Sequence, residues 1–160
     1  KNNTMKKLLF LFMLPALGFS QIFEEIITMT DVERFRKVMI ENDYKRHSTD
    51  SIRIVYADGL EKDSLGNYTA YRWGSYYIKT KSWRLKFSDG FTNYMAYEEI
   101  YKDVKENCDF SKILESTDSI EAVAYKCQEA KLQGLISFHK EDDGDGGYFI
   151  MHHNNPNINN

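Results

Sequence analysis

A five-residue motif that occurs twice constrains the fold of this chain more than any other feature. Ser-Thr-Asp-Ser-Ile stands at residues 48–52 and again at 116–120. In both places a helix-like pattern with Glu-Asn near its end comes first, at 41–42 and 106–107, and a strand-like pattern follows. The sequence therefore predicts two copies of one helix-then-strands unit. The alternative is coincidence added to the common statistics of helix, turn and strand, but five identities at the same place in the pattern favour duplication.

One amphipathic helix is predicted in each unit. The first begins with a capping box in which Thr30 accepts from an amide three residues later, and its apolar spacing predicts a helix over residues 30–43. In the second, apolar residues recur at i, i+3, i+4, i+7 and i+11 from Tyr97 to Cys108. Because neither helix can bury its apolar stripe alone, we expect both on one face of a sheet.

The strands are predicted from alternating or apolar segments bounded by turn residues. They are residues 51–57, 68–78 with a bend at Gly74, 83–87, 119–126, 132–139 and 148–152, while 109–115 is expected to be a short extended segment. The short turns between them favour antiparallel hairpins. The predicted fold is α+β: two tandem helix-strand-strand-strand repeats, at about 30–90 and 95–153, form a mostly antiparallel sheet of about six strands with two helices on one face.

This arrangement is similar in outline to the tandem α/β repeats of small exported inhibitor and binding proteins of the β-lactamase inhibitor protein type. That likeness concerns architecture only. The chain also resembles small exported bacterial proteins of unknown function that have a helix, Tyr-rich strands and a late cysteine pair. The second resemblance covers most of residues 21–153, but it includes no catalytic motif and therefore implies no site.

The first 20 residues have the pattern of an export signal. Two lysines follow Met5, an apolar run covers residues 8–14, and small residues stand at 18 and 20. We expect Met5 to be the start and residues 1–20 to be removed, which leaves a single domain at 21–153 in the periplasm or outside the cell. The alternative is a buried N-terminal helix. The run is too short to remain in a bilayer as a spanning helix, so no stable membrane insertion is expected after cleavage.

The charge of the remaining chain argues against nucleic acid as a partner. The leader holds three lysines and no acid, so 18 basic and 24 acidic residues remain, with a formal net charge of −6. Such a surface repels phosphate backbones. The basic stretch 79–86 alternates with apolar residues and indicates a solvated strand face, and the Asn-rich tail 154–160 is expected to be disordered.

Cys108 and Cys127 are the two cysteines of the chain. Disulfides persist where exported proteins fold, so we predict that the two cysteines pair and tie the end of the second helix to the end of a strand. The alternatives are two buried thiols or a catalytic cysteine, and the absence of a Cys-x-x-Cys spacing argues against redox chemistry.

Aromatic side chains concentrated on one predicted hairpin are the candidate binding residues. Exposed tyrosine and tryptophan make hot spots for protein partners and also stack on sugar rings. We therefore expect a partner that is a protein or a glycan of the cell envelope. The alternative is that these rings pack a second layer or lie half-buried. The candidate residues are Tyr71, Trp73, Tyr76, Tyr77 and Trp83.

An acidic, glycine-rich turn is the candidate metal site. Asp142, Asp143 and Asp145 supply carboxylates of the kind that calcium prefers. The EF-hand spacing fails, because a glycine takes the next alternate position and the closing Glu is absent. The alternative is a solvated hairpin turn.

The four histidines give no metal pattern. His152 and His153 are adjacent and would point to opposite faces of a strand. His139 is placed near a strand end and His47 in a loop, so we interpret all four as scattered surface residues.

No nucleophile elbow or phosphate-binding loop is present, and no cofactor is predicted. The sequence therefore favours an exported, non-catalytic and inhibitor-like binding module. The alternatives are a small periplasmic hydrolase, which needs a pocket with converging His and carboxylates, and a calcium-steadied surface protein.

Overall fold

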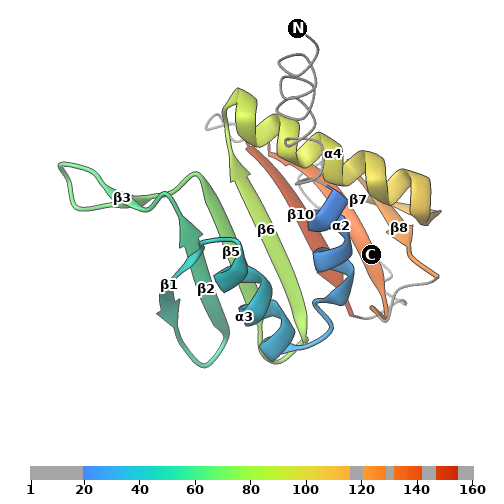
Figure 1. Cartoon of the computed structure of the whole chain (residues 1–160), viewed down its shortest axis with the longest axis horizontal. Coiled ribbons are helices and arrows are strands. Elements are labelled where there is room, and N and C mark those ends of the chain that lie inside the picture. The colour runs from blue at the N-terminus through green and yellow to red at the C-terminus, as the bar shows by residue number, and fades with distance from the viewer. Residues whose placement is uncertain (1–19, 116–120, 129–131, 142–146, 155–160) are drawn as a thin grey trace, which may run out of the picture.

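In the described part of the chain, an antiparallel sheet of eight strands forms the centre, and three helices lie on one of its faces (Figure 1). The structure is a computed structural model that describes residues 20–115, 121–128, 132–141 and 147–154. The sheet has the order β1-β2-β5-β6-β10-β9-β8-β7. Its strands are β1 (Lys45–Thr49), β2 (Arg53–Asp58), β5 (Arg72–Tyr77), β6 (Ser82–Ser88), β7 (Asp109–Glu115), β8 (Glu121–Lys126), β9 (Leu135–Glu141) and β10 (Gly147–His153). The helices are α2 (Ser20–Thr28), α3 (Val32–Glu41) and α4 (Phe91–Asn107), and β3 (Glu61–Lys62) pairs with β4 (Tyr68–Thr69) as a separate hairpin.

The predicted α+β class with an antiparallel sheet is confirmed, although the sheet has eight strands where about six were expected. β1, β2, β5 and β6 follow α3 along the chain, and β7 to β10 follow α4. In each group the neighbouring strands are antiparallel. The sheet therefore consists of two four-stranded meanders, each preceded by a helix, which meet where β6 pairs with β10.

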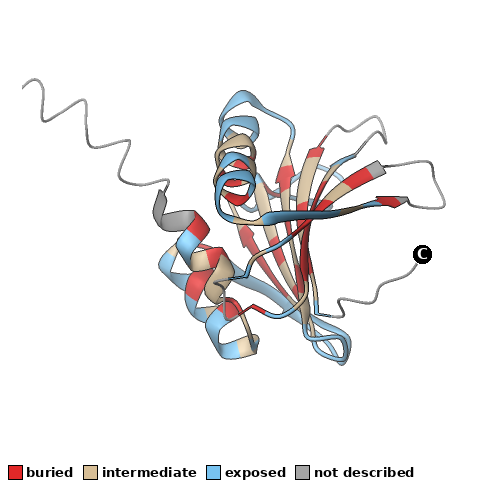
Figure 2. Cartoon of the chain, turned by 90° about the vertical axis from the view of Figure 1, so that its right-hand side faces the viewer, coloured by how far each residue is buried: buried red, intermediate tan, exposed pale blue. Residues whose placement is uncertain are grey.

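All three helices pack on the same face of the sheet, which we call the covered face (Figure 2). The helices pack against one core there because residues on alternate positions of each strand point to one side. On β6 these are Trp83, Leu85 and Phe87, all of which are buried. The helix residues that meet them are Ile26 of α2, Phe35, Val38 and Met39 of α3, and Tyr97, Ile100 and Val104 of α4.

The N-terminal helical region is two helices rather than one helix over 30–43. α2 ends at Thr28 and α3 begins at Val32. The predicted cap at Thr30 is wrong by one residue: Asp31 has extended backbone, and its carboxylate accepts from the Arg34 amide at 2.9 Å. Both residue types cap helices, and aspartate is the stronger of the two. Thr30 instead donates to the Asp31 carboxylate.

The two edge strands explain the shortfall in predicted strands. Every residue of β1 is exposed, so the strand has no buried face and no alternating pattern that the sequence could reveal. This corrects the placement of His47 in a loop. β7, expected only as an extended segment, forms the opposite edge. Both edges carry an irregularity in register, between Arg46 and Ser48 in β1 and between Phe110 and Lys112 in β7.

The predicted strand 68–78 is interrupted, but not at the expected bend. The chain leaves the sheet before Arg72, and residues 68–69 pair with β3 instead. Gly74 stays in register with Tyr56 on one side and Leu85 on the other. A glycine is needed there because a Cβ would overlap the sulfur of Met39 on α3.

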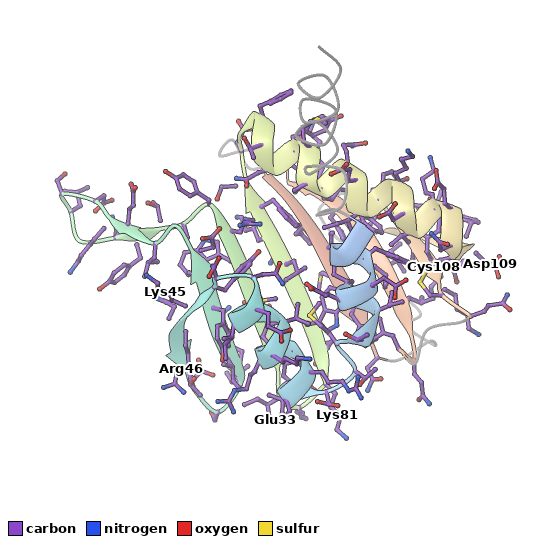
Figure 3. All side chains as sticks on the ribbon, viewed as in Figure 1. Glu33, Lys45, Arg46, Lys81, Cys108 and Asp109 are labelled. Carbon is purple, nitrogen blue, oxygen red and sulfur yellow. A yellow bond between two sulfur atoms is a disulfide. The ribbon has the colours of Figure 1, made fainter. Side chains whose placement is uncertain are left out.

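The predicted disulfide between Cys108 and Cys127 is confirmed (Figure 3). Cys108 caps the C-terminus of α4, and Cys127 follows the last residue of β8. The bond therefore links the second helix to a strand in the outer part of the second meander. Residues 108 and 127 are 19 apart in sequence, and closing a loop of this size stabilises a chain by about 3 kcal/mol in the chain-entropy model.

Replacing both cysteines with alanine is expected to lower the free energy of unfolding by about 3 kcal/mol, because the unfolded chain regains the freedom of the closed loop. Urea denaturation followed by circular dichroism measures the change. Reduction of the wild-type chain should lower stability by a similar amount and leave the double variant unchanged. Equal stability of the oxidised and reduced wild type would contradict the role of the bond.

Candidate functional site

The face of the sheet turned away from the helices holds the candidate site. We call it the outer face; no helix of the described residues lies on it (Figure 2). Strand pairing aligns its side chains in rows across the sheet. In one row Trp73 of β5 lies opposite Lys86 of β6, Lys86 opposite Phe149 of β10, and Phe149 opposite His139 of β9. Residues far apart in sequence therefore form one continuous surface.

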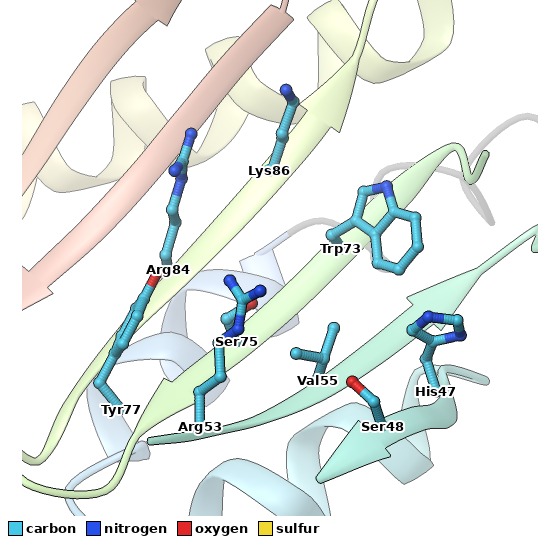
Figure 4. A pocket seen from close by; sticks show the side chains of 9 residues that line it. All are labelled: His47, Ser48, Arg53, Val55, Trp73, Ser75, Tyr77, Arg84 and Lys86. Atoms are coloured by element: carbon cyan, nitrogen blue, oxygen red, sulfur yellow. The ribbon is translucent and has the colours of Figure 1, made fainter. Parts of the chain in front are cut away.

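A groove with a volume of about 350 Å³ lies on this face over the first meander. Side chains from four neighbouring strands project into the same open space (Figure 4). On β2, β5 and β6 they come from one face because successive residues of a strand alternate sides, while the adjacent His47 and Ser48 lie at the register irregularity of β1. The lining residues are His47 and Ser48 of β1, Arg53 and Val55 of β2, Trp73, Ser75 and Tyr77 of β5, and Arg84 and Lys86 of β6.

Aromatic rings occupy both ends of the groove. Trp73 and Tyr77 are half-buried and lie on the same side of β5, four residues apart. The His47 imidazole meets the Trp73 ring edge-on, with the ring centroids 5.3 Å apart, and meets Tyr68 of the β3–β4 hairpin in the same way at 5.1 Å. His47 therefore joins the small hairpin to the rim of the groove.

The charged residues that line the groove, within the described part of the chain, are all basic: Arg53, Arg84 and Lys86. The Arg84 guanidinium lies 4.0 Å from the centroid of the Phe149 ring, a cation–π contact that fixes its position. The whole chain has a formal net charge of −3, so this concentration of positive charge runs against the overall balance. An anionic ligand is favoured here over a cationic one.

Next to the groove, two histidines share one buried hydroxyl. The Ser137 Oγ lies 2.7 Å from Nε2 of His139 and 2.8 Å from Nε2 of His153, and Ser137 is fully buried. A hydroxyl has a single proton, so it donates to one imidazole and accepts from the other. The His139 ring also stacks on Phe149, with the centroids 4.2 Å apart.

Both of these imidazoles are neutral at neutral pH. Burial, the neighbouring His153 and the Arg84 charge lower the pKa of His139 to about 4. Burial lowers the pKa of His153 to about 4 as well, with further contributions from His152 and Lys112. A neutral pair can share the serine, whereas two imidazolium ions side by side would repel each other.

The structure brings together two of the five predicted binding residues. Trp73 and Tyr77 line the groove, while Tyr76 and Trp83 lie in the core under the helices, 3% and 0% exposed. Tyr71 is exposed but lies elsewhere, over Gly59 and beside the start of α4. The alternation of side chains along each strand separates Trp73 and Tyr77, which lie on the outer face, from Tyr76 and Trp83, which lie on the covered face.

Sequence reasoning missed the polar half of the groove. Three lining residues, Ser75, Arg84 and Lys86, alternate with buried ones, and the basic stretch was interpreted only as a solvated face. His47 and Ser48 belong to the edge strand that no pattern revealed. Their placement depends on strand pairing, which the sequence does not specify on its own.

The interpretation of four scattered surface histidines is wrong. His152 is 2% exposed, stacks on Trp83 with the centroids 5.6 Å apart, and donates from Nε2 to the Gln133 carbonyl at 2.6 Å. Burial lowers its pKa. The expected opposition of His152 and His153 across β10 is correct, since one lies in the core and the other on the outer face.

The described residues contain no group of three or more His, Cys, Asp or Glu side chains that could hold a metal ion. The predicted calcium ligands Asp142, Asp143 and Asp145 lie outside the described residues, so that site stays a prediction. Among the helices in the described part of the chain, none has the length and apolar character needed to cross a bilayer. Comparison with protein-family models, curated proteins and solved structures finds no match for the chain.

Proposed function

We propose that this chain is a non-catalytic binding module that holds its ligand in the groove of the outer face. The observation that carries the proposal is the groove itself, in which Trp73 and Tyr77 stand beside three basic side chains on a sheet face that no described helix covers. Rings with few rotatable bonds lose little entropy when they bind, and they dominate the energetics of many interfaces.

The arrangement of the groove favours binding over catalysis. Its nine described residues include a single histidine, His47, and no carboxylate, so they offer no acid–base pair. Ser137 has two imidazole neighbours but is fully buried, which keeps a substrate from its oxygen. The cysteines are joined in a disulfide and supply no thiolate. A hydrolase therefore has less support than a binding module.

We also propose that the module is exported and that residues 1–20 are its leader. The disulfide fits a compartment outside the cytoplasm. Removal of residues 1–20 would leave Phe23 and Ile26, the buried residues of α2, in place. Intact-mass analysis of the protein recovered from the producing cell should give a chain that begins at Gln21. Recovery of a chain that retains residues 5–20 would contradict the proposal.

Duplication of one unit accounts for the architecture under the same proposal. Each meander follows a helix, and each begins with an edge strand that has a register irregularity. The first copy of the repeated motif, 48–52, spans the end of β1 and the turn to β2, and the second copy, 116–120, occupies the corresponding link between β7 and β8 in the chain. Crystallography tests this part of the proposal: the two halves should superpose strand by strand, and a different helix direction in one half would contradict duplication.

A capture experiment tests the binding proposal. Immobilised chain is incubated with solubilised envelope material of the producing cell, and the retained material is analysed for both protein and carbohydrate. We expect the wild type and Tyr71→Ala, a matched exposed aromatic outside the groove, to retain the same material, and the Trp73→Ala/Tyr77→Ala double variant to retain at least tenfold less. Equal retention by the double variant would place binding outside the groove, and retention of nothing by the wild type would contradict the function.

A further inference from the structure

Resting on the proposed function, we propose that the ligand of the groove is a linear carbohydrate chain that carries carboxylate groups. The groove offers what such a ligand requires: flat rings for the apolar C–H faces of sugars, cations for the carboxylates, and small polar groups for the hydroxyls. The argument depends on how strand register arranges these three kinds of group.

Each aromatic ring of the groove has a basic residue directly across from it on a neighbouring strand. Trp73 lies opposite Lys86 of β6, and Tyr77 lies opposite Arg53 of β2. Directly paired residues have Cβ atoms about 4.5–5.5 Å apart, so ring and cation can act on one unit of a ligand. A sugar that stacks on either ring would place a carboxylate substituent within reach of the adjacent cation.

The two ring–cation pairs are too far apart for a single sugar. Trp73 and Tyr77 are four residues apart on β5, which corresponds to about 13 Å along the strand. Ser75 lies between them on the same side, and Ser48 and His47 border the same space (Figure 4). A chain of several sugars can occupy both pairs and present its hydroxyls to these polar groups in between.

The composition of the groove favours a sugar chain over an acidic protein segment. Val55 is the one aliphatic residue among the described lining residues, and it is 7% exposed. Hot spots for protein partners lie in well-packed pockets that become fully desolvated, whereas Trp73 and Tyr77 are half-buried rings on an open groove. Stacking on open rings with polar contacts at both sides suits carbohydrate.

Charge gives the selectivity for an acidic chain. Without the leader, the protein carries a formal net charge of −6, while the described charges lining the groove are all basic. A polyanion is therefore repelled by the rest of the surface and attracted at the groove. Because the cations border an open groove, the attraction should weaken as salt shortens the Debye length.

Calorimetric titration of the oxidised chain, residues 21–160, tests the ligand class. The acidic probes are oligomers of galacturonate and of alginate; the controls are the methyl ester of the galacturonate oligomer, which removes the charge, and a hexaglutamate peptide, which keeps charge without sugar. We expect at least one acidic sugar oligomer to bind at low salt and to weaken on raising salt. The methyl ester and the peptide should bind at least tenfold more weakly.

The variants locate the interaction. Trp73→Ala and Arg53→Gln should each weaken binding of the acidic sugar about tenfold, as expected for loss of one hot-spot contact. Lys37→Gln, a cation on α3 on the other side of the sheet, should change it less than twofold. Equal weakening by Lys37→Gln would show that overall charge, and not the groove, attracts the probe, and would overturn the proposal.

The outcomes separate this proposal from the function on which it rests. Binding of hexaglutamate as tight as that of the sugars would replace carbohydrate with an acidic peptide, and equal binding of the methyl ester would remove the requirement for charge. If no acidic sugar binds while envelope capture is still lost in the Trp73→Ala/Tyr77→Ala variant, the ligand class is wrong and the binding function stands. If capture is also unchanged in that double variant, both proposals are contradicted.

Discussion

Replacing Trp83 with alanine is expected to lower the free energy of unfolding by about 4 kcal/mol, as for other fully buried large side chains. Trp83 has no exposed surface, donates from Nε1 to the Met29 carbonyl at 3.1 Å, and stacks on His152. It joins the segment between α2 and α3 to the middle of the sheet. Loss of the ring leaves a cavity under the helices and a carbonyl without its partner. Urea denaturation measures the change.

Trp73 provides the matched control, because the chain has two tryptophans in opposite environments. Trp73→Ala removes a half-buried ring from the groove and should cost no more than about 1 kcal/mol of stability, while binding suffers. Trp83→Phe should fall between the two alanine variants, since it keeps part of the ring and loses the hydrogen bond. Similar losses for Trp73→Ala and Trp83→Ala would contradict the assignment of one ring to the core and the other to the ligand.

Acidification from pH 7 to pH 4 is expected to destabilise the chain through its buried histidines. The pKa values of His139 and His153 are lowered to about 4, and that of His152 is also lowered, so the unfolded chain binds more protons than the folded chain in this range. Stability is therefore fully present above the unfolded pKa of about 6.5 and falls as the pH drops toward 4. The linkage relation gives a loss of about 3 kcal/mol at pH 4 for each of the two outer-face imidazoles, with the pair not strictly additive.

Two carboxylates with lowered pKa values, Asp50 and Asp63, act in a lower pH window than the histidines. Hydrogen bonds to backbone amides lower the pKa values of Asp50 and Asp63, so their contribution is lost only as the pH falls below about 4. The His139→Asn/His153→Asn variant should flatten the pH dependence between 7 and 4 when thermal unfolding is measured. An unchanged slope in the double variant would show that burial does not lower the pKa values of these rings in the folded chain.

The sequence predicts the elements that bury one face and fails on those that do not. The spacing from Tyr97 to Cys108 locates α4 up to its C-cap, and the alternation over residues 79–86 identifies the solvated side of β6. Those signals exist because burial selects apolar residues at the period of the element. β1 has no buried side chain, so its sequence shows no alternation of apolar and polar residues from which the strand could be predicted.

The groove was only partly predictable for a different reason. Trp73 and Tyr77 were candidates from their chemistry alone. Arg53 and Lys86 become candidates only when strand pairing places them opposite these two rings. A shift of one residue in pairing would turn each of them to the other face. Pairing is a property of the whole sheet, so a site assembled from four strands requires the fold before it can be recognised.

The position of the Cys108–Cys127 bond has a consequence for how the module would respond to a reducing environment. The covalent link lies in the half of the molecule that contributes no described residue to the groove, since every lining residue comes from β1, β2, β5 or β6. Breaking the link would loosen the far flank formed by β7 and β8, which within the described sheet pair with the remaining strands through β9. The groove and the disulfide thus lie in different halves of the molecule, and we expect reduction of the bond to lower the stability of the protein more than it changes the shape of the groove.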